Sequence, residues 1–406
     1  MMSWRVFEYN SGRQARCALK WLVAMAAAAG VAVTQTTRAR AEDTFGYRFE
    51  DYQEDGGRIS IQTDSWLLNT QIKPWLSLNV HAVHDAISGA SPTGSPAPSK
   101  IKFVPPGLGG PTGPFSTSVP METLTDDCWA GSFDPTLTLG RHRLTPEFSY
   151  SQEHDYISFG SALNYSVDLN EKNTTLNLGW SHNLDTVLPK GFLDKKAAKH
   201  SDEVLVGVNQ LLGPKTVLTA NLIFAGDRGY LNDQYKGALF ASDPQLDATQ
   251  PALEPEKRPR YRDRYTALVA LTQEVRPLHA SVEGSYRFYV DSYGVLAHTL
   301  DLAWYQKLGK YVVISPLFRY YRQSAADFYA EQFGDFNHPP AYYSADYRLS
   351  NLETFTVGLG INCRIQSWLT LDAGFKRYIM RGLDGVTSPT AYPSANVFTM
   401  GARLWF

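Results

Sequence analysis

Three consecutive residues carry groups that hydrolases use. Glu153, His154 and Asp155 set an imidazole beside two carboxylates, and a histidine held by a carboxylate is half of a catalytic triad. No nucleophile is marked by an elbow motif. Because successive residues of a strand point to opposite faces, His154 and Asp155 cannot act on each other if a strand has begun there. We therefore expect no catalytic residue, and we interpret the run as the polar start of a strand.

A second group of charged and titratable residues recurs at alternate positions of several segments. Alternation places side chains on one face of a β-strand, so we expect these residues to share the inner face of a sheet that closes on itself. Buried ions need partners or water, which predicts either a wet lumen or a network of paired charges. The candidate lumen-lining residues are His81, Asp85, Asp168, His279, Glu283, Arg287, Asp291, Asp301, Arg319, Asp372, Lys376 and Arg403.

The strands that would carry these residues are visible in the hydrophobic pattern. Along 355–363, five apolar residues from Phe355 to Cys363 alternate with small or polar ones. The same pattern recurs at 76–83, 157–168, 176–181, 278–291 and 369–376. Such alternation is typical of strands that separate lipid from a lumen, and backbone groups without water require a closed sheet. A soluble β-sandwich is the rival interpretation, because its strands alternate too.

The ends of the chain favour the membrane barrel. A basic start up to Lys20, an apolar run over 21–33 and a small-residue site at 39–41 predict a secretory signal peptide over 1–41. The apolar run is shorter than the roughly 20 residues of a spanning helix. Cleavage would remove more basic than acidic residues and leave an acidic chain, which argues against nucleic-acid binding.

The last nine residues, FTMGARLWF, place apolar side chains at every second position up to Phe406. This ending resembles the recognition signal of bacterial outer-membrane barrels, so we expect Phe406 to act as an assembly signal. The expected partners are outer-membrane lipid and the barrel-assembly machinery. The aromatic content of 13% also suits strands, because Tyr and Phe are strand formers.

We therefore predict an all-β fold: a transmembrane antiparallel β-barrel of about 14 strands (roughly 12–16), with short periplasmic turns and long extracellular loops. It would be a single barrel over 42–406, with a Pro/Gly/Ser-rich extracellular loop near 89–140 that is either solvated or folded into the lumen. The segment 143–150 alternates inside that loop and would raise the count to sixteen, although Pro146 argues against an interior strand. Trp75, Trp368 and Trp405 would form an aromatic girdle at the periplasmic rim.

Three motifs resemble those of a known family. HDAISGASPTG at 84–94, EHDY at 153–156 and NEKNTTL at 170–176 are similar to motifs of a bacterial domain-of-unknown-function family of predicted outer-membrane β-barrels. The resemblance spans most of the chain after the signal peptide. It implies a barrel in the outer membrane and carries over no catalytic residue.

Three functions are compatible with these expectations. The leading hypothesis is a narrow pore for small polar solutes or ions; the second is a structural barrel that docks or sleeves another envelope protein; the third and weakest is a barrel enzyme. Conductance would separate the first from the others, and co-purification of a partner would favour the second. No cofactor is expected, and no Cys/His spacing predicts a metal site. Cys128 and Cys363 are predicted to lie too far apart for a disulfide.

Overall fold

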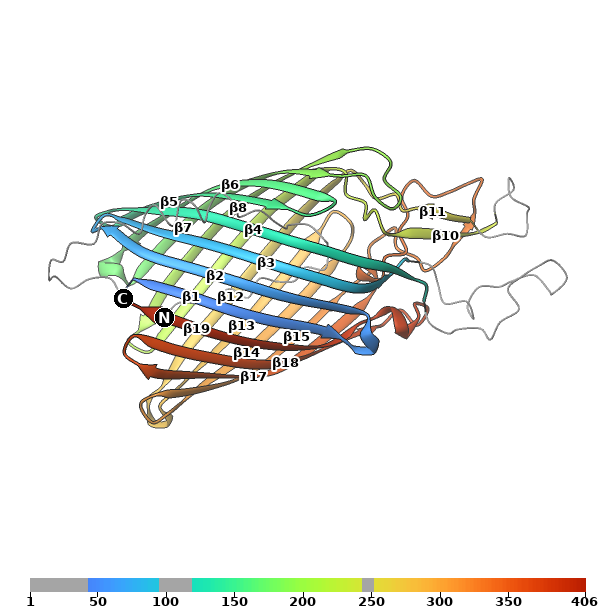
Figure 1. Ribbon diagram of the computed structural model, residues 1–406. Coiled ribbons are helices and arrows are strands. Elements are labelled where there is room, and N and C mark those ends of the chain that lie inside the picture. The colour runs from blue at the N-terminus through green and yellow to red at the C-terminus, as the bar shows by residue number, and fades with distance from the viewer. Residues whose placement is uncertain (1–42, 95–118, 243–251) are drawn as a thin grey trace.

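The computed structural model describes residues 43–94, 119–242 and 252–406. Sixteen antiparallel strands form a closed barrel (Figure 1), so the predicted all-β barrel class is confirmed. The predicted signal peptide and the Pro/Gly-rich stretch 95–118 lie outside the described residues. The part of the chain that the structure describes contains no apolar helix of membrane-spanning length.

The wall is built from strands in chain order, and the first strand pairs with the last. Thr44 lies opposite Trp405 and Glu54 opposite Ala395, which closes the sheet and leaves no edge in the wall. The wall strands are β1 (Thr44–Glu54), β2 (Ile59–Lys73), β3 (Leu76–Pro92), β4 (Met121–Leu139), β5 (His142–Gln152), β6 (Tyr156–Leu169), β7 (Thr174–Val187), β8 (Ala197–Gly213), β9 (Thr216–Gly229), β12 (Tyr261–Val275), β13 (Ala280–Asp291), β14 (Leu296–Leu308), β15 (Val312–Gln323), β17 (Leu352–Gln366), β18 (Leu369–Gly382) and β19 (Ser394–Trp405).

The strand count reaches the upper end of the predicted range because a hairpin replaces part of the expected loop. Strands β4 and β5 occupy 121–139 and 142–152, so the loop predicted near 89–140 is corrected over 121–139. The backbone ladder between β4 and β5 is interrupted between the pair Phe133–Phe148 and the pair Leu137–Leu144. Pro135 and Pro146 both lie in this gap. Proline has no N–H to give to a ladder, and the gap is where that loss is tolerated.

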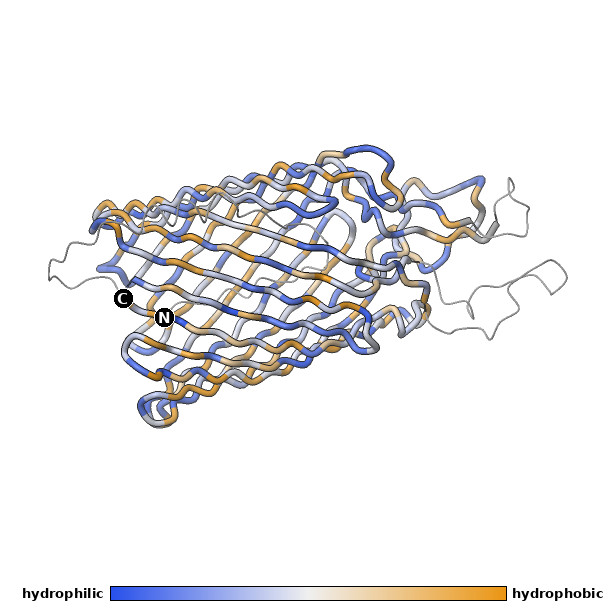
Figure 2. Tube along the Cα trace, in the orientation of Figure 1, coloured by the Kyte–Doolittle hydropathy of each residue, from blue (hydrophilic) through white to orange (hydrophobic). Residues whose placement is uncertain are grey.

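The two faces of the wall differ in chemistry. Hydropathy alternates along the wall strands (Figure 2), as expected when successive side chains point to opposite faces. One face carries large apolar side chains that are exposed. Examples are Leu178, Leu222, Val269, Leu302, Val357 and Phe375. The other face carries polar and charged residues such as Asp168, Asp301 and Arg319.

Contacts at one end of the barrel identify the polar face as the inner one. Tyr235 packs on Ile61 and Ile87, which share that face with Asp85. The neighbouring Lys236 donates to Ser91 of β3, and Tyr235 itself donates to Asp155 before β6. Only the interior of the barrel mouth brings a single loop against both of these positions.

The two ends of the barrel are built differently. Tight turns lie at the end that holds both termini (Figure 1), including the 3-10 turns η3 (Asn170–Lys172) before β7 and η4 (Arg276–Leu278) before β13. Trp405 donates its backbone N–H to the carbonyl of Trp368 at 2.9 Å, and Trp75 lies in the β2–β3 turn, so the three tryptophans share this end as predicted. Cys128 and Cys363 form no disulfide, as predicted, although Cys128 lies on β4 and not in an outer loop.

Long loops cover the opposite end. We call the described loop residues 230–242, 252–260, 324–351 and 383–393 the cap. The cap contains a small sheet in the order β11 (Ala252–Pro255), β10 (Gly237–Ser242), β16 (Phe333–Asp335). An apolar cluster packs the cap on the β13–β14 turn, with Tyr293 and Val295 of that turn against Ala326 and Leu349 of the cap. The cap is therefore a packed layer over the mouth. The 3-10 turns of the chain are η1 (Asp55–Gly57), η3 (Asn170–Lys172), η4 (Arg276–Leu278), η5 (Tyr347–Leu349) and η6 (Pro389–Ala391).

Candidate functional site

Eleven of the twelve candidate lumen residues lie on wall strands at positions of the polar face. The register shows this directly where two of them meet: Asp301 of β14 lies opposite Arg319 of β15, and Ser285 beside Asp301 connects them to β13. The residues placed on this face are His81, Asp85, Asp168, Glu283, Arg287, Asp291, Asp301, Arg319, Asp372, Lys376 and Arg403.

His279 is the exception, and its prediction is wrong. It follows the 3-10 turn η4 with φ 48° and is exposed. Pro277 ends the β12 ladder because it lacks an N–H, and β13 begins only at Ala280. The alternation predicted over 278–291 therefore begins two residues before the strand does. The carbonyl of His279 accepts from Lys307 at 3.1 Å, so the residue serves the turn.

Ion pairs run along the inner face of the wall. Arg143 donates to both carboxylate oxygens of Asp168 at 2.6 and 2.9 Å. Asp301 and Arg319 are 3.1 Å apart. Arg48 reaches Asp372 at 3.0 Å across the intervening strand β19. Each of these charges is compensated by an opposite one, and the pairs place both signs of charge on the inner face.

A denser belt of ion pairs lies just below the cap. It crosses five adjacent strands, from β7 to β13. Its pairs are Asp185–Lys199 at 3.4 Å, Asp227–Arg264 at 3.1 Å and Asp291–Arg262, whose Nε donates at 2.8 Å. All three aspartates and Lys199 are buried. Over this arc, the mouth at the cap end is therefore lined by salt bridges, and the two charges within each pair neutralise each other.

The cap itself is tied together by a buried ionic cluster. Arg258 contacts Glu256 at 2.7 Å and Asp346 at 2.8 Å, and Ser344 donates to Glu256 at 2.5 Å. Arg348 pairs with Asp346 and with Asp233. Glu256 and Asp346 are only 2% and 1% exposed. The cluster joins the β9–β12 loop to the β15–β17 loop.

Burial and charge shift the titration of this cluster in opposite directions. Burial raises the pKa of Glu256, with Arg258 acting against the shift. Burial alone would also raise the pKa of Asp346, but Arg348 and Arg258 lower that pKa to about 2. Asp346 is therefore ionised throughout the physiological range, and it holds both arginines.

Lys236 fastens the cap to the wall. Its Nζ donates to Ser91 Oγ at 3.0 Å and to the carbonyl of Pro92, and it lies 5.9 Å from the centre of the Tyr347 ring. A buried ammonium group without such acceptors would be costly. These contacts hold the start of β10 against the end of β3.

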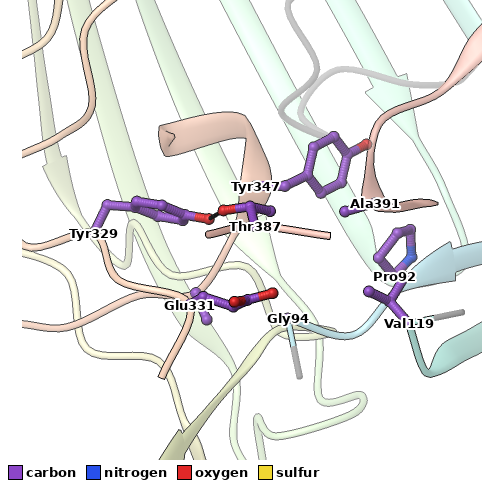
Figure 3. A pocket seen from close by; sticks show the side chains of 9 residues that line it. Pro92, Gly94, Val119, Tyr329, Glu331, Tyr347, Thr387 and Ala391 are labelled. Carbon is purple, nitrogen blue, oxygen red and sulfur yellow. Dashed lines mark hydrogen bonds between the residues drawn. The ribbon is translucent and has the colours of Figure 1, made fainter. Parts of the chain in front are cut away.

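A small cavity between the cap and β3 has no capacity for a ligand. Figure 3 shows its lining, in which Tyr329 and Thr387 are hydrogen-bonded to each other. The cavity has room for about one water molecule at most. Its lining residues are Pro92, Gly94, Val119, Tyr329, Glu331, Ala345, Tyr347, Thr387 and Ala391.

The run Glu153, His154 and Asp155 does not assemble half of a triad. Glu153 and Asp155 are buried, whereas His154 is exposed between them. Asp155 instead accepts hydrogen bonds from Gln234, at 2.6 Å, and from Tyr235. Asp155 therefore contacts the cap loop, whereas His154 is exposed.

Several charged residues of the site were not predicted from the sequence. Arg48 and Arg143 alternate with apolar neighbours in β1 and β5, so the parity of those strands could have found them. The cap cluster has no comparable signal. Asp233 and Arg348 are separated by 115 positions and lie in loops without periodicity.

Comparisons with known proteins give a family and a set of barrels. The model of a family described as "Protein of unknown function (DUF3570)" matches residues 14–388. No curated protein matches the chain. The siderophore receptor PirA from Pseudomonas aeruginosa is similar at 12% identity and a TM-score of 0.43, covering 91% of this chain and 62% of the receptor.

Two further solved structures are similar in the same way. CdiB from Acinetobacter baumannii has 10% identity and a TM-score of 0.49, covering 91% of this chain and 61% of CdiB. OmpT, an outer membrane protein of Vibrio cholerae, has 11% identity and a TM-score of 0.43, covering 92% of this chain and 100% of OmpT. The chain spans about three fifths of the length of PirA and CdiB.

Proposed function

The chain belongs to the DUF3570 family of proteins of unknown function, and we propose that it forms a channel for small polar solutes or ions in the bacterial outer membrane. The observation that carries this proposal is the closed sixteen-stranded wall with a charged inner face. Barrels of sixteen to eighteen strands leave an aqueous channel, whereas smaller ones fill with side chains.

The outer face supports a membrane location. Its side chains are large and apolar, and many are about half exposed. A continuous apolar surface of this size is rare on soluble monomers and is ordinary on a barrel that faces lipid. The closed ladder also leaves the wall no unpaired strand edge in hydrocarbon.

The inner face supports the passage of polar solutes. Carboxylates and guanidinium groups alternate along the wall, as in the pairs Asp168–Arg143 and Asp301–Arg319. Such a surface offers water and polar solutes hydrogen bonds on every side. An apolar solute would find no apolar side chains on such a surface to pack against, and it would displace the water that solvates the polar groups.

The cap supports a narrow entrance. Its loops are held by buried ion pairs and by Lys236, so they are not free to swing away from the mouth. Solutes would enter between this fixed layer and the belt of salt bridges beneath it. We therefore propose that the channel selects solutes first by their size, at the cap, and second by their charge, at the belt of salt bridges.

Planar-bilayer conductance tests the proposal. The refolded barrel, verified by heat-modifiable migration on gels, is inserted into bilayers in KCl, and liposomes holding the barrel are assayed for swelling with sugars of increasing size. We expect discrete conductance steps, with swelling for small sugars and none for large ones. Inserted, folded barrels that give neither conductance nor swelling with the smallest solute would overturn the channel.

A second candidate, docking of another envelope protein, is favoured by one feature. Strands β10 and β11 project beyond the wall (Figure 1), and within the described residues the outer strands β11 and β16 of their sheet have no further ladder partner. Open strand edges accept an extra strand from a partner. Co-purification of one envelope protein with a non-conducting barrel would favour this function over the channel.

A further inference from the structure

Three charged residues lie in one row on the outer face of the wall, near its cap end. Arg322 of β15 lies opposite Glu353 of β17, and Glu353 lies opposite Arg381 of β18. The row belongs to the outer face because it continues the alternation of Phe318 and Val357, an exposed apolar pair nearer to the turn end of the same strands. Both arginines are exposed. Charged groups therefore follow the apolar surface of β15 and β17 at its cap end.

The row lies where the membrane should end. Strand β15 climbs from Val312 to Arg322 at about 3.3 Å per residue. A tilt of about 35–45° reduces this climb to roughly 25 Å, which is the height of the apolar band of outer-membrane barrels. The pair Tyr320–Phe355 lies directly beneath the row, with ring centres 5.0 Å apart. Because aromatic girdles mark the two membrane interfaces, the row is at the level of the lipid headgroups.

The two arginines present positive charge that no neighbour neutralises. Neither makes an ion pair among the residues that the structure describes. Arg381 lies over the Phe355 ring, 5.9 Å from its centre. The carboxylate between the arginines has a different partner, because Glu353 accepts a hydrogen bond from the Tyr320 hydroxyl at 3.1 Å. Both guanidinium groups are therefore available to an anion at this level.

We propose that Arg322 and Arg381 bind the phosphate of a lipid headgroup in the leaflet on the cap side. Neighbouring strands are about 4.8 Å apart, so the two arginines start roughly 10 Å from each other and their long side chains can converge on one phosphate. A guanidinium group matches phosphate with paired, charge-assisted hydrogen bonds. This inference rests on the membrane location proposed above and not on conduction.

A lipid fits this place better than a soluble anion does. A free anion would gain only contacts with exposed charges, which water and salt weaken. A lipid phosphate is held at this height by the membrane, and its acyl chains would pack on the exposed side chains of Phe318 and Val357 below the row. Two contacts of different chemistry therefore act on the same molecule.

The test is lipid binding by the folded, full barrel. The detergent-refolded protein, verified by heat-modifiable migration, is titrated with lipid A, a glycolipid that carries phosphates, and with chemically dephosphorylated lipid A. Native mass spectrometry counts the lipid that stays bound. We expect the wild type to bind lipid A about tenfold more tightly than the dephosphorylated form, as charge-assisted hydrogen bonds allow.

Variants of the row should change this preference in both directions. Arg322→Gln and Arg381→Gln should each weaken lipid A binding about threefold to tenfold. Glu353→Gln should strengthen it, because the variant removes a negative charge beside the phosphate. The matched control is Arg228→Gln, near the cap end of β9, since Arg228 is exposed on the same face but already pairs with Asp263 at 2.6 Å. Its loss should leave lipid A binding unchanged.

Three results would overturn the site. The first is equal binding of lipid A and its dephosphorylated form by the folded wild type. The second is lipid A binding that Arg322→Gln and Arg381→Gln leave as strong as Arg228→Gln does. The third is displacement of lipid A by millimolar inorganic phosphate, which would make the row a site for soluble anions.

The membrane location is checked separately, by flotation of the refolded barrel with phosphatidylcholine vesicles. A barrel that does not float with these vesicles would contradict the membrane location and the lipid site together. A barrel that floats and shows no preference for phosphate would contradict the lipid site alone. Neither measurement depends on conductance, so failure of the lipid site and failure of the channel are distinguishable.

Discussion

Arg348 and Asp233 are 115 residues apart in the chain, and their side chains meet at 2.5 Å inside the cap. Arg348 also holds Asp346, so one guanidinium group joins two loops. Removing it leaves the buried carboxylate of Asp346 and the largely buried one of Asp233 without this partner. The loss of one partner of a buried pair costs about 3–5 kcal/mol, which is enough to release a loop.

We therefore predict that Arg348→Met loosens the cap and leaves the wall intact. Conductance should rise, and protease should cut the cap faster, while heat-modifiable migration is unchanged. The control is Arg276→Met in the η4 turn, whose pair with Glu274 is largely exposed and is worth about 0–1 kcal/mol. Equal behaviour of the two variants would contradict the role of the cap cluster.

Acid should release the cap through Asp346. Its pKa is lowered from 3.8 to about 2, because Arg348 and Arg258 outweigh its burial. A carboxyl whose folded pKa is depressed stabilises the fold above its unfolded pKa and loses that contribution as the pH falls through the folded pKa. We expect protease cleavage of the cap to accelerate between pH 4 and pH 2.

The raised pKa of Glu256 has the opposite effect on stability. Its contribution to the free energy of unfolding is present below its unfolded pKa of 4.5 and declines as the pH rises above that value. Asp346→Asn separates the two groups. This variant should have a looser cap at neutral pH and lack the acid step between pH 4 and pH 2. An unchanged acid step in Asp346→Asn would assign the transition to other carboxylates.

The sequence predicted the parts of this fold that repeat locally. Alternation along 355–363 and 369–376 identified β17 and β18 because a strand that separates lipid from a lumen must alternate. The same rule placed Asp301 and Arg319 on one face, and the register sets them opposite each other. Pro146 misled the strand count, because the ladder gap that accommodates it is set by pairing with β4.

The cap and its contact with the β5–β6 connection lay beyond such reasoning. Glu256 and Asp346 are in loops with no period, and their partners are chosen by tertiary packing. Glu153 and Asp155 stood out in the sequence, but as neighbours of His154 and not as neighbours of Asp126 and Gln234. Contacts between segments that are 28 to 79 residues apart produce no periodic pattern in the sequence from which they could be predicted.

The chain end should matter more for assembly than for stability. Phe406 is 67% exposed, and its backbone N–H donates to the carbonyl of Asp43 at 3.0 Å, so its side chain buries little surface. Deleting Phe406 should lower the amount of heat-modifiable barrel in cells, while refolding of the purified chain in detergent is unchanged. Phe406→Tyr keeps an aromatic ending and should assemble normally. Normal barrel levels in the deletion strain would count against an assembly signal.

The inside–outside assignment of the wall can be tested with one pair of neighbours on β12. Val269 is 50% exposed on the apolar face near the middle of the strand, whereas Ala270 lies on the polar face between Thr219 and Ser285. Val269→Arg would place a charge in mid-membrane lipid at a cost of about 2–4 kcal/mol. Ala270→Arg would place the same charge in the lumen, where water and nearby polar groups accept it, so its cost should be smaller and its effect should be on ion selectivity. The two variants share strand, depth and introduced side chain, and their free energies of unfolding are compared by urea titration in lipid vesicles. If Val269→Arg folded as stably as Ala270→Arg, the apolar face could not be the one that meets lipid.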